Sequence, residues 1–183
     1  MKVELAQIKG RDGDTAYNLT RALEVIATCA VDTDLLILPE TYITGFPTKD
    51  NIANLAEPLN GPSIQRLHAA AKARNISVAV GFAEVCDGRY FNTTVLITPE
   101  DGVALHYRKT QLWSGERDVF EPEARPLGTA SCSSRKSKKG KVTQFPEHEK
   151  KLCCPKDLSP LAAKRAYDSV GQNCRCMLRI APE

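Results

Sequence analysis

Two oppositely charged residues follow strand-like segments and could meet in one site. Glu40 comes after the apolar run 35–38, which Pro39 ends. Because proline has no N–H to give to a sheet, the strand stops there and Glu40 is the first side chain beyond it. Lys109 follows the β-rich run 103–107 in the same way. Ligands of open α/β sheets bind beyond the carboxyl ends of strands, so both residues are candidates for a site. The alternative is that each residue merely lies in a solvent-exposed loop.

Alternating strand and helix patterns must position these two charges. The first three apolar segments and the two amphipathic stretches between them are typical of βαβ units with parallel strands. Two later β-rich segments are separated by turn residues and predict hairpin-connected strands, so the fold class is α/β with a mixed sheet. We expect strands at 2–8, 34–39, 76–83, 90–98 and 103–108, and helices at 15–30 and 62–74.

The net charge of +3 conceals two chemically different parts. Residues 1–124 hold 12 Lys/Arg and 17 Asp/Glu, a net charge of −5, whereas residues 125–183 hold 13 and 5, a net charge of +8. Five of the seven cysteines lie in the second part, and the apolar periodicity ends near Pro126. We therefore predict a domain over 1–126 and a poorly ordered basic Cys/Lys/Ser-rich tail over 127–183, with few buried contacts over 128–150.

Composition restricts the location of the protein. No apolar run approaches the ~20 residues that a membrane-spanning helix needs. The first residues lack the long apolar segment of a signal peptide, so a cytoplasmic location is expected. Free thiols are then favoured over a disulfide framework.

Several ordered motifs resemble the nitrilase superfamily of carbon–nitrogen hydrolases over residues 1–122. Leu35-Leu-Ile-Leu-Pro-Glu40 with Gly45-Phe46 is similar to the first family motif. Tyr107-Arg-Lys109-Thr-Gln-Leu, followed by Glu116 and Phe120, is similar to the second. Val80-Gly81-Phe-Ala-Glu and Tyr90-Phe-Asn92-Thr93 match the strand and hairpin between them. The resemblance is greatest to amidase-like members, and it implies an incomplete αββα sandwich and a small amide or carbamoyl amine as substrate.

The resemblance also assigns roles. Glu40 would be the general base, Lys109 the lysine that stabilises the oxyanion, and Glu116 an auxiliary glutamate near a cysteine nucleophile. The chemistry agrees, because a thiol is mostly protonated at neutral pH and a neighbouring carboxylate would help to deprotonate it. An ammonium group aimed at the developing oxyanion stabilises the tetrahedral intermediate. Neither a metal nor an organic cofactor is implied.

The family's third motif, a cysteine at the end of a buried strand, has no clean counterpart here. Phe145-Pro-Glu147 has the letters that follow this cysteine, but Gly140 occupies the cysteine's place. Cys154, preceded by Cys153, lies at a plausible distance from Lys109 and is the candidate nucleophile, although Glu149-Lys-Lys151 stands where apolar residues should lead in. A tail that comes from an altered reading frame or an alternative exon would explain the abrupt change of sequence pattern near residue 126. Such a tail predicts a truncated hydrolase of impaired activity.

The tail has other interpretations. Cys153, Cys154, Cys174 and Cys176 with His148 could be called a zinc cluster, but their spacing is not the usual Cys-x₂₋₄-Cys of structural sites. The basic run 135–141 could contact phosphates, but it has no aromatic residues, which argues against nucleic acid as a partner. A non-catalytic homologue that acts as an interaction module is the rival hypothesis, and a homo-oligomer formed through the sheet sandwich stays open.

Overall fold

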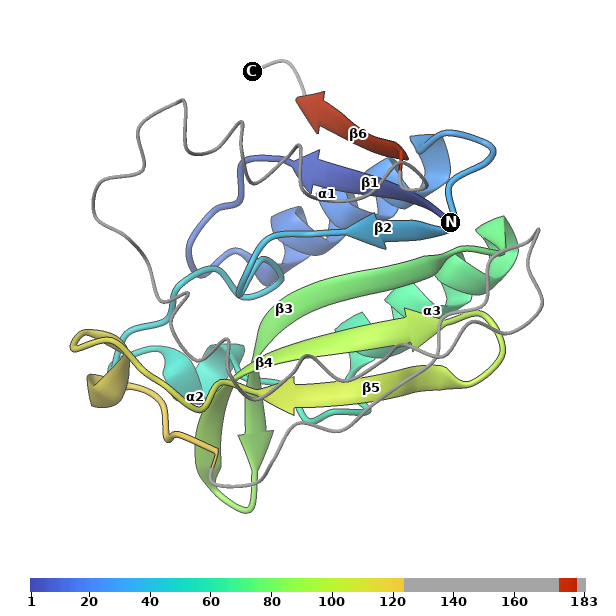
Figure 1. Ribbon diagram of the computed structural model, residues 1–183. Helices are drawn as coiled ribbons and strands as arrows, with labels where there is room; N and C mark the ends of the chain where they lie inside the picture. The colour runs from blue at the N-terminus through green and yellow to red at the C-terminus, as the bar shows by residue number, and fades with distance from the viewer. Residues whose placement is uncertain (124–174, 181–183) are drawn as a thin grey trace, which may run out of the picture.

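The described part of the protein forms one sheet, with its two long helices on one of the faces (Figure 1). The computed structural model describes residues 1–123 and the backbone of the strand 175–180. The six strands lie in the order β5-β4-β3-β2-β1-β6. The strands are β1 (Lys2–Gln7), β2 (Leu35–Ile37), β3 (Ser77–Cys86), β4 (Arg89–Thr98), β5 (Gly102–Arg108) and β6 (Arg175–Ile180). The helices are α1 (Thr15–Thr28), α2 (Ile52–Leu55), α3 (Pro62–Arg74) and the short 3₁₀ turn η1 (Glu116–Asp118).

The directions of the strands determine where their ends meet. Strands β1, β2 and β3 are parallel, and β4 is antiparallel to both β3 and β5. Strand β5 therefore runs in the same direction as β2, and the two carboxyl ends lie at the same edge of the sheet. Glu40 lies three residues beyond Ile37, the end of β2, and Lys109 directly follows β5, so the topology brings the two predicted charges to one edge.

Local sequence signals explain the helix boundaries. The Asp14 side chain accepts a hydrogen bond from the backbone N–H of Tyr17 and caps α1. Pro62 occupies the first turn of α3, where a missing N–H costs nothing. Asn75 ends α3 in the left-handed conformation, with φ 52°, which asparagine tolerates better than most residues. Each of these ends agrees with the sequence prediction within two residues.

The larger of two apolar clusters lies between the two long helices and the sheet. The inner faces of α1 and α3 pack on the central strands (Figure 1), and most of the core side chains are aliphatic. Burying an aliphatic side chain contributes about 1.5–3 kcal/mol, so this layer dominates the stability of the described part. The fully buried members include Ala22, Ile26, Leu36, Ile43, Leu67, Ala71, Val78, Val80, Val95 and Ile97.

The predicted α/β class with a mixed sheet is confirmed. The structure adds three elements that the periodicity did not predict, namely α2, η1 and β6. Strand β6 pairs in parallel with β1 and falls within the segment predicted as a poorly ordered tail. Residues 124–174 lie outside the described residues, and so do the boundary near 126 and the expected lack of contacts over 128–150. No helix among the described residues is both long and apolar enough to span a membrane.

Gly81 allows the loop after β2 to cross β3. A Cβ atom at this position would lie 2.4 Å from the backbone nitrogen of Thr41 and 3.0 Å from the carbonyl carbon of Glu40. The crossing is held by a hydrogen bond from the Ile43 N–H to the Gly81 carbonyl oxygen. Thr41 adopts φ 49°, an unfavourable value for a β-branched residue. The direction in which Glu40 leaves the sheet therefore depends on this close backbone contact.

We expect Gly81→Ala to lower the free energy of unfolding by about 2 kcal/mol or more, because the methyl group would press on backbone atoms that cannot rotate away. Urea unfolding followed by circular dichroism measures this change. Gly88→Ala is the matched control, since Gly88 has φ +73° but nothing within 4 Å of an added Cβ. Its cost should be about 1 kcal/mol, from backbone strain alone. Equal costs for the two variants would contradict the close contact at Gly81.

Candidate active site

Lys109 lies between two carboxylates at the edge of the sheet. Its Nζ atom donates to Glu40 Oε1 at 2.8 Å and to Glu116 Oε1 at 2.9 Å. The three predicted residues come from three different segments: the loop after β2, the residue after β5, and η1. The structure thus brings Glu40, Lys109 and Glu116 together, while their catalytic roles stay a prediction. Cys153 and Cys154 lie outside the described residues.

Asn92 is a second donor to the same two carboxylates, a role that was not predicted from its sequence position. Its Nδ2 atom lies 2.7 Å from Glu40 Oε1 and 2.7 Å from Glu116 Oε1. The side chain is buried on β4, and the backbone N–H of Lys109 donates to the Asn92 carbonyl oxygen at 2.8 Å. One signal was available in the sequence: asparagine is depleted in strands, yet it stands in the middle of a β-rich run.

The two carboxylates have different surroundings. The side chain of Glu116 is 1% exposed, and its second oxygen accepts a hydrogen bond from the Trp113 N–H at 3.0 Å. The side chain of Glu40 is 57% exposed, and both of its hydrogen bonds reach the same oxygen, Oε1. Glu116 therefore accepts hydrogen bonds with both oxygens inside the protein, whereas Glu40 faces solvent.

The hydrogen bonds set the charge state of this cluster. Partial burial would raise the pKa of the Glu40 carboxyl, but hydrogen bonds from Lys109 and Asn92 outweigh it and lower the pKa below its usual value. Burial would lower the pKa of Lys109, but its hydrogen bonds to Glu40 and Glu116 outweigh that effect and raise it. An ionised carboxylate and an ammonium group therefore lie side by side near neutral pH, as proton transfer and oxyanion stabilisation require.

The cysteines with described side chains are not part of this cluster. Cys29 is the buried residue that caps the end of α1, and its Sγ atom donates to the Ile26 carbonyl oxygen. Cys86 ends β3, and its Sγ atom lies 3.7 Å from Asp87 Oδ2. Within the described part of the chain, neither thiol is hydrogen-bonded to Glu40. Of the residues weighed for a zinc cluster, Cys176 lies on β6, of which only the backbone is described, and the others lie outside the described part.

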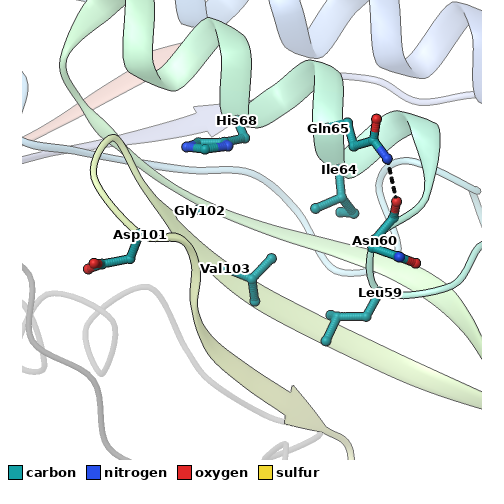
Figure 2. Close-up of a pocket in the computed structure, with 8 residues that line it drawn as sticks. All are labelled: Leu59, Asn60, Ile64, Gln65, His68, Asp101, Gly102 and Val103. Atoms are coloured by element: carbon teal, nitrogen blue, oxygen red, sulfur yellow. Dashed lines mark hydrogen bonds between the residues drawn. The ribbon is translucent and has the colours of Figure 1, made fainter.

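A separate cavity of about 470 Å³ lies at the opposite end of β5 (Figure 2). Leu59, Ile64 and Val103 form its apolar wall, and His68 and Asp101 stand at its rim. Val103 is near the start of β5, whereas Lys109 follows its last residue. The cavity is therefore not a continuation of the carboxylate–lysine site.

The fold and the site together define a class of protein. A mixed α/β sheet carries a carboxylate and a lysine beyond the carboxyl ends of two strands, which is the arrangement that the resemblance to carbon–nitrogen hydrolases implies. The sequence model of the carbon–nitrogen hydrolase family matches residues 2–152. The chain belongs to this family. The match extends beyond residue 122, where the resemblance was expected to stop, and it ends immediately before Cys153.

Two curated relatives illustrate the similarity. Over 122 residues the chain is 57% identical to an (R)-stereoselective amidase of Pseudomonas sp., an alignment that covers 67% of this chain and 44% of the amidase. Over 165 residues it is 33% identical to a protein of Pseudomonas protegens described as a hydrolase in the pqqF 5′ region, covering 83% of this chain and 55% of that protein. The chain thus spans about half the length of these relatives.

Solved structures share the fold. One is XC1258 from Xanthomonas campestris, a CN-hydrolase superfamily protein with an arsenic adduct in its active site, with a TM-score of 0.60 at 24% identity, covering 70% of this chain and 47% of the other. Another is an amidase from Nesterenkonia sp. AN1 in complex with butyramide, with a TM-score of 0.61 at 23% identity, covering 70% and 50%. At these identities the comparison supports the fold alone.

We expect Lys109→Met to destabilise the protein by about 2 kcal/mol at pH 7, because charge-assisted hydrogen bonds to two carboxylates are lost. Glu40 would then face Glu116 with no cation between them, so the pKa of Glu40 should rise above its ordinary value of about 4.3. A raised folded-state pKa contributes stability that is present at low pH and is lost as the pH rises through that pKa.

The destabilisation by Lys109→Met should therefore be larger at pH 7 than at pH 5. Chemical denaturation at both pH values measures the difference. Lys72→Met, which removes an exposed lysine from α3, is the control and should change stability little at either pH. A Lys109→Met effect that is the same at pH 5 and pH 7 would show that the lysine does not control the ionisation of the cluster.

Proposed function

We propose that this chain derives from an amidase-type hydrolase that cleaves a small amide or carbamoyl amine through a glutamate, a lysine and a cysteine. The observation that carries the proposal is the position of Lys109 Nζ between Glu40 and Glu116, at 2.8 and 2.9 Å. Family membership supports the reaction class, and the 57% identity to an (R)-stereoselective amidase favours an amide over a nitrile as substrate.

The surroundings of the two carboxylates support a division of roles. Glu40 is the general base, because it is exposed to solvent and its pKa keeps it ionised and able to accept a proton at neutral pH. Glu116 is auxiliary, because its two oxygens already accept hydrogen bonds from Lys109, Asn92 and Trp113. The ammonium group of Lys109 is available to stabilise an oxyanion that forms beside Glu40.

In this mechanism a cysteine thiol transfers its proton to Glu40, and the thiolate attacks the amide carbon. The oxyanion of the tetrahedral intermediate is stabilised by Lys109. When the C–N bond breaks, the amine leaves with the proton from Glu40, and a thioester remains. Water, activated by Glu40, hydrolyses the thioester to the acid and restores the thiol. Neither a metal nor an organic cofactor takes part, and Cys154 is the candidate nucleophile.

We further propose that the chain of 183 residues catalyses this reaction poorly or not at all. The family match ends at residue 152, and the residues that precede Cys154 are charged rather than strand-forming. A nucleophile that is misplaced by ~1 Å costs about 100-fold in rate, and without a nucleophile only residual catalysis from binding and oxyanion stabilisation is left. A non-catalytic homologue that binds a partner through its basic segment is the alternative, supported by the net charge of +8 over 125–183.

A turnover assay on a panel of small amides and carbamoyl amines tests the proposal. We expect ammonia or amine release by the full chain to be close to the uncatalysed rate, with Glu40→Ala and Cys154→Ala indistinguishable from it. Robust turnover that both substitutions abolish would show that Cys154 is a working nucleophile and that the chain is a competent amidase. Turnover that neither substitution affects would refute the assignment of the site.

A further inference from the structure

A buried carboxylate lies directly behind the candidate active site. Glu84 of β3 is 1% exposed and takes no part in the proposed reaction. Its Oε2 atom accepts from Thr93 Oγ1 at 2.7 Å and from Arg108 Nε at 2.9 Å, and its Oε1 atom lies 2.5 Å from a second nitrogen of Arg108. His106 Nε2 is also 2.7 Å from Oε2. Glu84 therefore contacts side chains of both β4 and β5.

The residues that Glu84 contacts alternate with the residues that hold the catalytic carboxylates. Thr93 and Arg108 are cross-strand partners in the β4–β5 register. The residue before Thr93 is Asn92, and the residue after Arg108 is Lys109. Successive side chains of a strand point to opposite faces. Glu84 therefore contacts one face of this strand pair, and the Asn92 and Lys109 side chains lie on the other. The hydrogen bond between the Lys109 N–H and the Asn92 carbonyl oxygen joins the two segments.

We propose that the Glu84–Arg108 ion pair, together with Thr93, positions Asn92 and Lys109 so that both reach Glu40 and Glu116. Glu84 is a positioning residue, because it touches none of the reacting groups. This inference rests on the proposed function for its catalytic meaning. The structural part of the inference is that Glu84, on one face of the strand pair, determines the position and ion pairing of Lys109 on the other. This part is testable without any substrate.

The surroundings of the ion pair support a rigid connection. The Arg108 side chain is 6% exposed, and its guanidinium group lies 4.0 Å from the centre of the Phe91 ring, so the aromatic face fixes its plane. Its two-pronged contact with Glu84 restricts orientation more than a single hydrogen bond would. Burial alone would raise the pKa of Glu84, but hydrogen bonds from Arg108, His106 and Thr93 lower it to about 2, so the carboxylate stays charged.

The backbone on either side of Glu84 is also held in place by hydrogen bonds. Ala83 and Val85, its two neighbours, both pair with Glu57: the Glu57 N–H donates to the Ala83 carbonyl oxygen, and the Val85 N–H donates to the Glu57 carbonyl oxygen. The Ala83 N–H donates to Thr44 Oγ1, in the loop that begins at Glu40. Substituting Glu84 should therefore disturb the strand pair it contacts rather than the strand that carries it.

Competitive acetylation of lysines with a trace of acetic anhydride tests this proposal on the full chain. Only an unprotonated amine reacts, so an ion-paired lysine is labelled slowly, and mass spectrometry gives the ratio of Lys109 to the exposed Lys72. In Glu84→Gln we expect this ratio at pH 8 to rise by about threefold or more, which corresponds to a fall of at least half a unit in the apparent pKa of Lys109. Arg108→Lys, which keeps the positive charge but loses the two-pronged contact, should change the ratio in the same direction.

Glu4→Gln is the matched control. Glu4 is another glutamate of the same sheet that is 1% exposed, and it lies on β1, away from Lys109. Its Oε2 atom accepts hydrogen bonds from the Ala30 N–H and from Thr33 Oγ1. This variant should leave the Lys109 ratio unchanged even if it lowers the melting temperature. All labelling is done on protein that circular dichroism shows to be folded, and Arg108→Lys replaces Glu84→Gln if the latter does not fold.

An unchanged Lys109 ratio in a folded Glu84→Gln or Arg108→Lys variant would overturn the proposal. An equal rise in Glu4→Gln would overturn it too, because it would show general loosening rather than positioning. The result does not depend on turnover. A chain that hydrolyses no amide can still show the labelling change, and failure of the labelling prediction leaves the assignment of Glu40 and Lys109 untouched.

Discussion

One ammonium group shared by two carboxylates is the interaction on which the candidate site depends. Without Lys109, Glu40 and Glu116 would present like charges to each other, and a proton shared between them would neutralise the base. Asn92 donates to the same two oxygens but brings no charge, so it orients the carboxylates without compensating their repulsion. The lowered pKa of Glu40 therefore depends on the end of β5, which carries Lys109, staying in register with β4.

That requirement explains much of the surrounding structure. The loop after β2 reaches the site because Gly81 allows it to cross β3 at backbone contact distance. The middle of β4 and the end of β5 are joined on the opposite face by the buried contacts of Glu84 with Thr93 and Arg108. An ion pair at such a depth is weak as a source of stability, since desolvation offsets much of the attraction. Its geometric role is the better physical reason for its presence beside the site.

The sequence predicted the parts of the structure that depend on local pattern. Pro39 ends a buried run and indicated that Glu40 lies just past a strand, although β2 already ends at Ile37, before the predicted limit of residue 39. Asn92 was missed because its role depends on side chains 52 and 24 residues away. Strand β6 was missed because its partner, β1, lies at the other end of the chain, and no local periodicity encodes a pairing over that separation.

The proposed function implies that Glu40 and Lys109 are in place as base and oxyanion stabiliser but that no thiol is activated by them. Alkylation of the full chain by iodoacetamide between pH 6 and pH 9, quantified for each of the seven cysteines by mass spectrometry, tests it directly. A thiol paired with a base and a cation would show a depressed pKa and rapid alkylation near neutral pH. We expect that no cysteine reacts with such a pH profile and that Glu40→Gln changes none of the alkylation rates. A cysteine that is alkylated about tenfold faster than the others at pH 7, and is slowed by Glu40→Gln, would contradict it.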